Sequence, residues 1–387
     1  MKKVFAVLMA ALMVAAMMAG CGASGETSGE ADSATVKIGT TGPLTGPNAQ
    51  YGIAVEAGMK IAVEEINALG GLQFEFKAQD DEADGEKAVA GYNALKDWGM
   101  QIFGGSVTSG AAAAVAAEAV NDQMFMLTPS ASAVEVAQTG ANVFQMCFTD
   151  PNQGASAAEL MAQEWPDAKI GVIYDSSDPY SAGIYNGFMA KAKELALEVV
   201  AETAFTSDTK ADLSTQVTQC QDAGADMIFM PFYYTEASQA ITYANKIGYK
   251  PTFFGCDGMD GILEVEGFDL ALAEGLVLMT PFDPNATDDA TVSFVTKYKA
   301  QNNDQVPNQF AADGYDVVYA IYEALTAAGL DGTASVEELN AALVKWFNET
   351  EGFNGLTGKG MTWDESGMIS KTPAAVVITN GVYVPMG

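Results

Sequence analysis

The fold is decided by the stretch Gln101–Ser132, which reads QIFGGSVTSGAAAAVAAEAVNDQMFMLTPSAS. It begins with a short apolar strand, Gln101–Phe103, that stops at glycine, serine and threonine. The alanine-rich run Ala111–Asn121 has high helix propensity and no breaker, which places Ser109 at the expected N-cap. A second apolar strand, Met124–Leu127, follows. The stretch therefore predicts a strand–helix–strand unit of a parallel sheet.

Both strands of this unit run into hydroxyl residues, at Gly104–Gly110 and at Thr128–Ser132. In an open parallel sheet, ligands bind at the carboxyl ends of the strands, where free backbone N–H groups and helix N-termini favour an anion. Two neighbouring strand ends of this kind predict a cradle for a small carboxylate. The same residues are also typical of ordinary N-caps and turns, so both interpretations stay open at this point.

The rest of the chain continues this alternation of strands and helices. After the N-terminal segment about 350 residues remain, which is too many for one ordinary core and indicates two domains. The strands are short and the intervening patterns have helical length, as in parallel α/β sheets with helices on both faces. A C-terminal hairpin is predicted by Asn380-Gly381 between two β runs. We expect strands at 36–40, 74–79, 101–103, 124–127, 142–148, 169–174, 198–205, 226–232, 252–255 and 275–279, and helices at 52–69, 86–98, 111–121, 151–164, 181–195, 211–223, 235–247, 288–301, 311–328 and 335–347.

The N-terminal segment has the composition of an export signal. Residues 1–20 contain two lysines and then an uninterrupted apolar run, which ends in small residues before Cys21. This pattern predicts a lipoprotein signal peptide and lipidation of Cys21. A transmembrane anchor is the alternative, although the run is barely long enough to span a membrane and no stop-transfer charges follow. Residues 21–34 predict a flexible tether, so we expect an extracytoplasmic protein held at the cell membrane by lipid only.

The composition excludes several functions. The chain has no histidine, all 18 of its basic residues are lysines, and its formal net charge is −32. A chain this acidic will not bind nucleic acid through its general field. Without histidine, Ser-His-Asp and Cys-His nucleophile systems cannot form, and we expect no metal site and no cofactor. Without arginine, an anion must be held by backbone amides, hydroxyls or lysine.

Cysteines and acidic residues outside the cradle have mostly structural interpretations. Cys147, Cys220 and Cys256 lack metal-like spacing, so we expect buried thiols, with one disulfide as the alternative. Asp80–Glu82 is expected to be a solvated loop that caps the next helix, and a metal or acid–base cluster is the alternative. Asp257 follows a strand directly, where an N-cap and a functional acid are equally consistent with the position.

Aromatic side chains in loops after strands need a reason to be there, because such loops are exposed. Five residues fit this description: Tyr51, Tyr180, Tyr233, Tyr234 and Phe310. Taken one at a time, each position favours the surface or the core over a ligand contact.

Six short motifs give the chain a resemblance to a known family. They are TGPLTG at 41–46, AQYG at 49–52, the Asp80-Asp81 pair, LTPSAS at 127–132, DPNQG at 150–154 and TWDESG at 362–367. In this order and spacing they resemble the leucine/isoleucine/valine-binding proteins of ABC importers, from about Val36 to the C-terminus. The resemblance implies an α/β fold with two doubly wound parallel-sheet lobes joined by a three-crossing hinge, as in type I periplasmic binding proteins. Lobe 1 would comprise 35–149 and 282–360, and lobe 2 would comprise 150–281 and 361–387.

The resemblance also implies roles for individual residues. Ser109 and the segment Ser130, Ala131 and Ser132 would hold the carboxylate of an amino acid. Asp257 would receive its ammonium group, and four aromatic residues, Tyr51, Tyr180, Tyr233 and Phe310, would wall its side chain. The chain departs from the pattern at two points. Asp257 stands where the best-known members have glutamate, which predicts a different ligand size, and Ala83 and Thr108 lie where a disulfide would be.

We therefore expect a monomeric lipoprotein that captures an amino acid, in first place a branched-chain aliphatic one, and delivers it to the permease of an ABC importer. Hinge closure around the ligand would be the mechanism, with no bond made or broken. A ligand-sensing subunit with the same pocket is one alternative. A carboxylate-based hydrolase using Asp80, Asp81 or Asp257 is another, although it would need paired acids converging on one bond.

Overall fold

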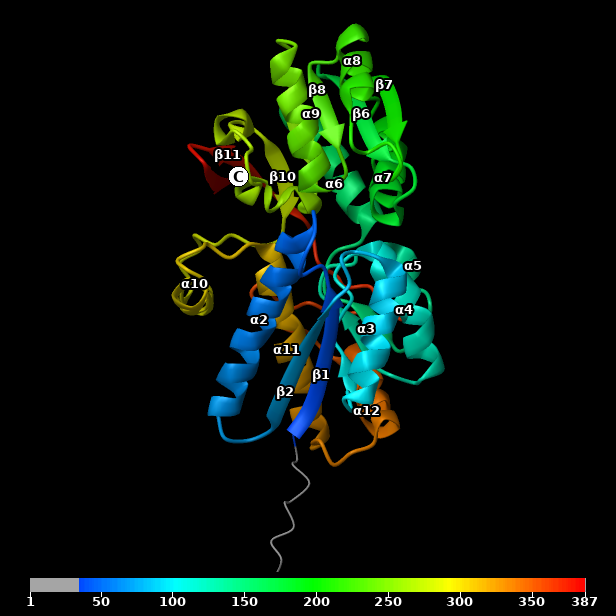
Figure 1. Ribbon diagram of the computed structural model, residues 1–387, viewed down its shortest axis with the longest axis vertical. Helices are drawn as coiled ribbons and strands as arrows, with labels where there is room; N and C mark the ends of the chain where they lie inside the picture. Colours follow the sequence, from blue (N-terminus) through cyan, green and yellow to red (C-terminus); the bar gives the residue numbers. More distant parts are fainter. Residues whose placement is uncertain (1–34, 387) are drawn as a thin grey trace, which may run out of the picture. The chain divides into compact units, whose positions relative to one another are not determined.

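The computed structural model describes residues 35–386 and contains two β-sheets flanked by helices (Figure 1). The signal peptide, Cys21 and the tether predicted for residues 1–34 lie outside the described residues. The strands are β1 (Thr35–Gly42), β2 (Gln73–Asp80), β3 (Ile102–Phe103), β4 (Met126–Thr128), β5 (Val143–Gln145), β6 (Lys169–Asp175), β7 (Glu198–Phe205), β8 (Met227–Met230), β9 (Thr252–Gly255), β10 (Val277–Thr280), β11 (Ala374–Thr379) and β12 (Val382–Pro385). The helices are α2 (Ala49–Ala68), α3 (Gly85–Asp97), α4 (Ser109–Asn121), α5 (Val134–Ala137), α6 (Asp150–Glu164), α7 (Pro179–Glu194), α8 (Ser214–Asp222), α9 (Tyr234–Lys246), α10 (Asp289–Gln301), α11 (Gln309–Ala328) and α12 (Val336–Glu349), with 3₁₀ turns η1 (Asp257–Met259), η2 (Ile262–Glu264) and η3 (Leu270–Ala273).

The first sheet has five parallel strands in the order β2-β1-β3-β4-β5. β1 and β2 pair over their full lengths, from Thr35 opposite Gln73 to Gly42 opposite Asp80. Because all five strands run the same way, their carboxyl ends lie along one edge of the sheet. The glycine- and hydroxyl-rich loops after β3 and β4 therefore meet at that edge, as the sequence predicted.

The second sheet has seven strands in the order β12-β11-β10-β9-β8-β6-β7. The five strands from β6 to β10 are parallel, whereas β11 runs antiparallel to both β10 and β12. Asn380 and Gly381 have φ angles of 52° and 75° and form the two-residue turn between β11 and β12. The predicted C-terminal hairpin is thereby confirmed.

Helices cover both faces of both sheets. On the first sheet, α2 and α11 pack together on one face, and α3 and α4 lie on the other (Figure 1). α2 and α11 approach closely because Gly58 and Gly314 have no side chains: a Cβ on Gly58 would lie 1.9 Å from the carbonyl oxygen of Ala311. On the second sheet, α6 and α7 share a core with one face, and α8 and α9 with the other. Two doubly wound lobes, one around each sheet, are thus confirmed.

The chain passes between the two lobes three times, after β5, after β10 and after α12. The first and third crossings lie side by side. Trp363 Nε1 donates to the Gln145 carbonyl at 2.7 Å, and Asn152 Nδ2 donates to the Lys371 carbonyl at 3.1 Å. The residue boundaries proposed for the lobes stay a prediction.

The predicted elements are confirmed within a few residues, with one informative difference. The strand expected at 142–148 pairs only over Val143–Gln145, although residues 146–148 are buried as well. Their apolar character reflects burial in the first crossing and not strand pairing. Cys147, Cys220 and Cys256 are all free and buried, so the structural interpretation of the cysteines holds and the disulfide alternative is wrong.

Candidate functional site

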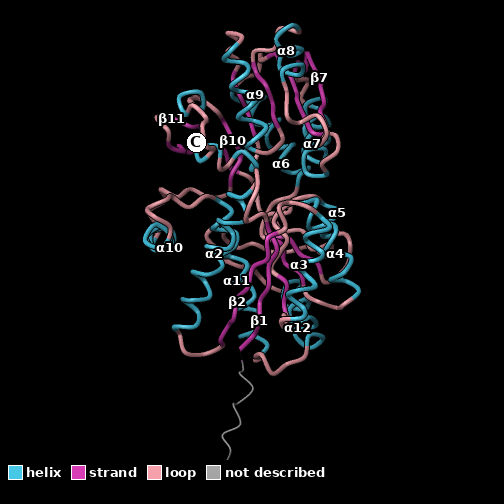
Figure 2. The backbone as a smooth tube through the Cα atoms, viewed as in Figure 1, coloured by secondary structure: helices cyan, strands magenta, loops and turns pink. Residues whose placement is uncertain are grey.

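The candidate site lies between the lobes, where loops dominate the chain path (Figure 2). Loops after β3 and β4 reach it from the first sheet, and the start of α7, the loop after β8 and the turn η1 reach it from the second. They enclose a cavity of about 20 Å³. Seven of the nine residues predicted to bind a ligand line this cavity. Its lining consists of Tyr51, Val107, Thr108, Ser109, Ser130, Tyr180, Tyr233, Asp257, Gly258 and Phe310.

Asp257 is the acid of this cavity, and it is only 4% exposed. Its Oδ1 accepts hydrogen bonds from the Tyr180 hydroxyl at 2.6 Å, Gln153 Nε2 at 3.0 Å and the Gly258 amide at 2.8 Å. Within residues 35–386 no hydrogen bond reaches Oδ2. The N-cap of η1 is Cys256 and not Asp257, so capping does not account for this carboxyl.

The protonation of Asp257 depends on what lies beside it. Burial raises the pKa of its carboxyl above the ordinary value, while the hydrogen bonds from Tyr180 and Gln153 oppose the rise. A cation next to Oδ2 would favour the charged form. The carboxyl is therefore fixed through one oxygen and suited to receive a cationic group through the other.

Four aromatic rings surround the same cavity. Tyr180 and Tyr233 stack with their ring centroids 5.0 Å apart and their planes 2° from parallel. Tyr51 packs against Tyr233 and Phe310, with centroid distances of 5.6 Å and 4.6 Å. Tyr51, Tyr180 and Phe310 are buried and Tyr233 is half-buried. Such a wall suits an apolar side chain or the methylene stem of a longer one.

The loop between β3 and α4 differs from the prediction by one residue. α4 begins at Ser109, and Thr108 occupies its N-cap position, so the assignment of Ser109 as N-cap was wrong. The cause is the run of hydroxyl residues, since neighbouring Ser and Thr offer nearly equivalent caps. The first amides of α4 have no intrahelical acceptors, and the positive end of the helix faces this loop. Ser109 and Ser130 both line the cavity beside these amides.

The hydroxyls of the two loops also hold the loops against each other. Thr128 Oγ1 donates to the Ser106 carbonyl at 2.6 Å, and Ser130 Oγ donates to the Val107 carbonyl at 2.8 Å. Ser109 Oγ accepts from the Ala133 amide at 3.2 Å. The cradle therefore has a fixed shape before any ligand contact is made.

Ala131 and Ser132 do not line the cavity in this arrangement. The Ala131 amide donates to Thr128 Oγ1 at 2.9 Å, and the buried Ser132 hydroxyl has no partner within the described residues. Of the predicted carboxylate cradle, the structure thus brings Ser109 and Ser130 to the cavity. Ligand contacts for Ala131 and Ser132 stay a prediction.

The two lobes touch across the site. The Tyr51 hydroxyl, from α2 on the first lobe, donates to the Gly258 carbonyl of the second lobe at 2.5 Å. The Gln50 amide donates to the Tyr234 hydroxyl at 3.2 Å, and Thr235 Oγ1 donates to the Pro47 carbonyl at 2.9 Å. A cavity of about 20 Å³ holds a single water molecule. An amino acid can therefore occupy this site only if the lobes or their side chains move apart.

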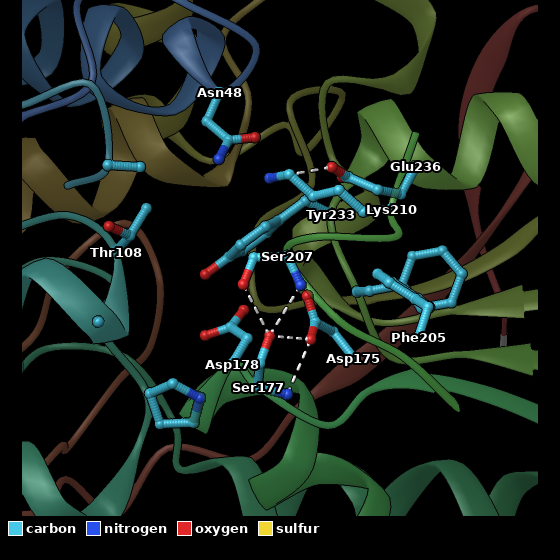
Figure 3. Close-up of a pocket in the computed structure, with 14 residues that line it drawn as sticks. Asn48, Thr108, Asp175, Ser177, Asp178, Phe205, Ser207, Lys210, Tyr233 and Glu236 are labelled. Carbon is cyan, nitrogen blue, oxygen red and sulfur yellow. Dashed lines mark hydrogen bonds and ion pairs between the residues drawn. The ribbon is translucent and has the colours of Figure 1, made fainter. Parts of the chain in front are cut away.

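A second cavity of about 200 Å³ adjoins the first, and Thr108 and Tyr233 line both (Figure 3). We call the smaller one the inner cavity and the larger one the outer cavity. The first lobe contributes four residues to the outer cavity, and the second lobe contributes the rest. Its lining consists of Asn48, Ala83, Thr108 and Gly110, and of Asp175, Ser177, Asp178, Pro179, Phe205, Ser207, Lys210, Phe232, Tyr233 and Glu236.

The acidic residues 80–82 line neither cavity. Asp80 accepts hydrogen bonds from Leu44 and Thr45, and Asp84, not residues 80–82, caps α3. Asp81 is fully buried, so the expectation of a solvated loop is wrong for this residue. Among residues 35–386, no group of three or more acidic or cysteine residues could hold a metal ion.

Four residues of the inner site were missed from the sequence: Gln153, Val107, Thr108 and Gly258. Gln153 belongs to the DPNQG motif, and it both donates to Asp257 and accepts from the Asp257 amide at 2.6 Å. The position of Gln153 within the DPNQG motif is a sequence signal that could have identified it. Val107 and Gly258 carry no distinguishing side-chain chemistry, so no sequence signal marks them.

This protein has two lobes, each built on a largely parallel sheet, and between them lies a cavity lined by one acid, hydroxyl residues and aromatic rings. This architecture defines a binding protein of the periplasmic type. The periplasmic binding protein family model matches residues 35–381, and the chain belongs to this family. Proteins of the family bind substrates and are not enzymes, which excludes the hydrolase alternative.

Named relatives and solved structures extend the comparison. The chain is 27% identical over 332 residues to the leucine-, isoleucine-, valine-, threonine- and alanine-binding protein of Pseudomonas aeruginosa, covering 84% of this chain and 87% of the relative. It is similar to the leucine binding protein LivK of Thermotoga maritima, with TM-score 0.81, 26% identity and coverage of 91% and 98%. It is also similar to LivJ of Streptococcus pneumoniae in complex with isoleucine, with TM-score 0.80, 28% identity and coverage of 90% and 97%. No helix within residues 35–386 combines the length and apolarity needed to cross a membrane.

Proposed function

We propose that this protein is the extracytoplasmic substrate-binding lipoprotein of an ABC importer and captures a branched-chain aliphatic amino acid. The proposal is carried by one observation: the predicted acid, hydroxyls and aromatic rings, which come from separate segments of the sequence, line one cavity between the lobes. The relatives named for leucine, isoleucine and valine support the choice of ligand class.

Each part of the site has a role in this proposal. Asp257 Oδ2 receives the ligand ammonium, while Oδ1 stays fixed by Tyr180 and Gln153. Ser109, Ser130 and the first amides of α4 hold the ligand carboxylate, with Ala131 and Ser132 joining them on closure. Tyr51, Tyr180, Tyr233 and Phe310 pack against the aliphatic side chain.

The mechanism is hinge closure between lobe 1, at 35–149 and 282–360, and lobe 2, at 150–281 and 361–387. The small inner cavity supports it, because a ligand must be admitted to an open form and then enclosed. In the enclosed form, both charged groups of the amino acid exchange water for fixed partners. The closed form would then deliver the ligand to the permease subunits.

Attachment to the membrane is proposed from the sequence of residues 1–34 alone. Signal cleavage before Cys21 and lipidation of its thiol would leave the globular part on the tether 21–34. A monomer is sufficient for this function, because both lobes of the site come from one chain. Co-purification with permease subunits would support transport, and co-purification with a receptor would support the sensing alternative.

The test of ligand class is thermal unfolding of the purified protein in the presence of each of the twenty amino acids. A ligand that binds only the folded state stabilises it by about 2.7 kcal/mol at a concentration a hundredfold above Kd. We expect at least one of leucine, isoleucine and valine to raise the melting temperature. If no amino acid raises it, the proposed function is wrong.

A further inference from the structure

The outer cavity is not needed to bind a branched-chain side chain, yet it is built with polar groups from both lobes. Asp175, Asp178 and Glu236 place three carboxyl groups around it, and Lys210 is the one basic residue of its lining (Figure 3). Lys210 lies 3.4 Å from Glu236, and its side chain is 40% exposed. The lining therefore carries a formal excess of two negative charges. An acidic cluster alone does not define a ligand site.

Three buried polar atoms of the lining have no partner within the described residues: Asn48 Oδ1, Thr108 Oγ1 and Glu236 Oε2. Their residues are 8%, 6% and 5% exposed. An unpartnered buried acceptor is destabilising, because burial removes the water that would otherwise donate to it. The amide oxygen of Asn48 and the ionised carboxylate oxygen of Glu236 can only accept hydrogen bonds, so the partner that they lack is a donor. The Thr108 hydroxyl can accept from the same donor.

Asn48 and Thr108 are both residues that would normally cap a helix. Asn48 holds the N-cap position of α2, and Thr108 holds that of α4, but neither side chain makes a capping hydrogen bond. Such residues at N-caps usually accept a bond from the first turn. Figure 3 shows the Asn48 side chain projecting into the outer cavity. Neither side chain is engaged in capping its helix, so both are available to a ligand in the outer cavity.

The inner and outer cavities adjoin, so one long ligand side chain could extend through both. Thr108 and Tyr233 belong to both linings, so a side chain that starts in the inner cavity passes between them to reach the outer one. The rings of Phe205, Phe232 and Tyr233 provide apolar surface for a methylene stem. An aromatic face also attracts a cation that lies over it.

We propose that the ligand range of this protein extends to α-amino acids whose long side chain ends in a cation, with the end group held in the outer cavity by Asp178, Glu236, Asn48 and Thr108. The inference rests on the proposed function, because the α-ammonium and α-carboxylate occupy the inner site. An ammonium or guanidinium group supplies the donors that the unpartnered oxygens need and offsets the excess negative charge.

The test is calorimetry of the purified protein with leucine, norleucine and lysine. Lysine is norleucine with a terminal ammonium, so their ratio of affinities isolates the end group. We expect lysine to bind at least tenfold more tightly than norleucine. Leucine or norleucine binding with equal or weaker lysine binding overturns this inference and leaves the proposed function standing. Failure of all three to bind overturns this inference, whereas the proposed function is overturned only if none of the twenty amino acids raises the melting temperature.

Two variants locate the effect. Asp178→Asn keeps the N-cap of α7, since asparagine caps as well as aspartate, and Glu236→Gln removes the buried carboxylate. Either change should bring the lysine to norleucine affinity ratio down at least fivefold. Glu198→Gln makes the same charge change on an exposed position of the same lobe and should leave the ratio unchanged. An unchanged ratio in both cavity variants, each folded by circular dichroism, overturns the assignment of the outer cavity.

Discussion

The hydroxyl of Tyr51 donates a 2.5 Å hydrogen bond to the carbonyl oxygen of Gly258, and this bond joins the first lobe to the second. Both groups are buried, so the carbonyl would lose its donor if the hydroxyl were removed. The same ring packs against Tyr233 and Phe310. A substitution that removes only the hydroxyl of Tyr51 therefore tests its hydrogen bonding between the lobes without removing the packing of its ring.

Tyr51→Phe should reduce the compact fraction of the ligand-free protein. The ring keeps its packing, while the hydroxyl loses its bond to the Gly258 carbonyl and the longer bond, at 3.3 Å, that it accepts from the Tyr234 amide of the second lobe. A net bond is worth about 0.5–1.5 kcal/mol, so the ratio of closed to open forms should fall by at least about twofold. Small-angle scattering should show a larger radius of gyration. Tyr92→Phe is the matched control, because the Tyr92 hydroxyl bonds Asp122 within the first lobe. Superimposable curves for Tyr51→Phe and the unaltered protein would show that the bond does not hold the lobes together.

Asp257→Asn should weaken amino-acid binding by about 2–5 kcal/mol, or roughly 30-fold to several thousand-fold. Asparagine can keep the Oδ1 bonds from Tyr180, Gln153 and Gly258. Its side chain carries no negative charge, and a neutral amide nitrogen replaces Oδ2. The ligand ammonium would be buried with weaker compensation. Calorimetry on the variant measures the loss.

Ser130→Ala provides the comparison for Asp257→Asn. It should weaken binding less, because backbone amides of α4 still face the carboxylate. An unchanged affinity in Asp257→Asn, with the fold intact, would remove the ammonium assignment and with it the preference for amino acids.

Lys371 and Asp313 form a buried ion pair at 3.0 Å, and both side chains are almost fully enclosed. Burial raises the pKa of Asp313 to about 7, and the positive charge of Lys371 opposes the rise. Lys371→Met should destabilise the protein by about 3–5 kcal/mol at neutral pH, because Asp313 is then buried without a partner. Urea unfolding measures the change. The exposed pair of Lys60 and Glu56 gives the control, since Lys60→Met should cost less than about 0.5 kcal/mol.

The acid and the hydroxyls of the inner site could be predicted because they stand at strand ends. Ser109, Ser130 and Asp257 lie in the loops that follow apolar strands, and parallel strands bring their carboxyl ends to one edge. The contact between Tyr51 and Gly258 could not be predicted, because it depends on how two lobes come together. The outer cavity was missed for a related reason: its lining comes from both lobes, and only the structure shows that the Asn48 side chain does not cap α2.

Cys21→Ser should move the protein from the membrane to the soluble fraction or the medium. The thiol is the atom that would carry the lipid, and the tether 21–34 contains no other cysteine. Fractionation of cells expressing either form measures this. A serine hydroxyl does not replace the thiol as the lipid acceptor, so membrane retention equal to that of the unaltered protein would refute lipid anchoring.

Asp81 and its neighbour Asp80 should give opposite pH dependences of stability. Asp81 is fully buried, and burial raises the pKa of its carboxyl to about 6, against an ordinary 3.8. The folded protein therefore favours protonated Asp81 and loses stability as the pH rises from about 4 to about 6. Asp81→Asn removes that loss, so its unfolding free energy relative to the unaltered protein should rise by up to about 3 kcal/mol between pH 4 and pH 7.

For Asp80, partial burial alone would raise the pKa, but hydrogen bonds from Thr45 and the Leu44 amide lower it below the ordinary value. Its stabilising contribution is present above the unfolded pKa and is lost as the pH falls towards the folded pKa. Asp80→Asn should therefore lose stability relative to the unaltered protein as the pH rises towards about 5, and the difference should stay constant above that pH. Urea unfolding of both variants between about pH 3 and about pH 8 measures the two trends, with the change for Asp80 below about pH 5 and the change for Asp81 above about pH 4. Trends of the same sign would contradict the assignment, because the two carboxyls are adjacent in sequence and differ only in burial and hydrogen bonding.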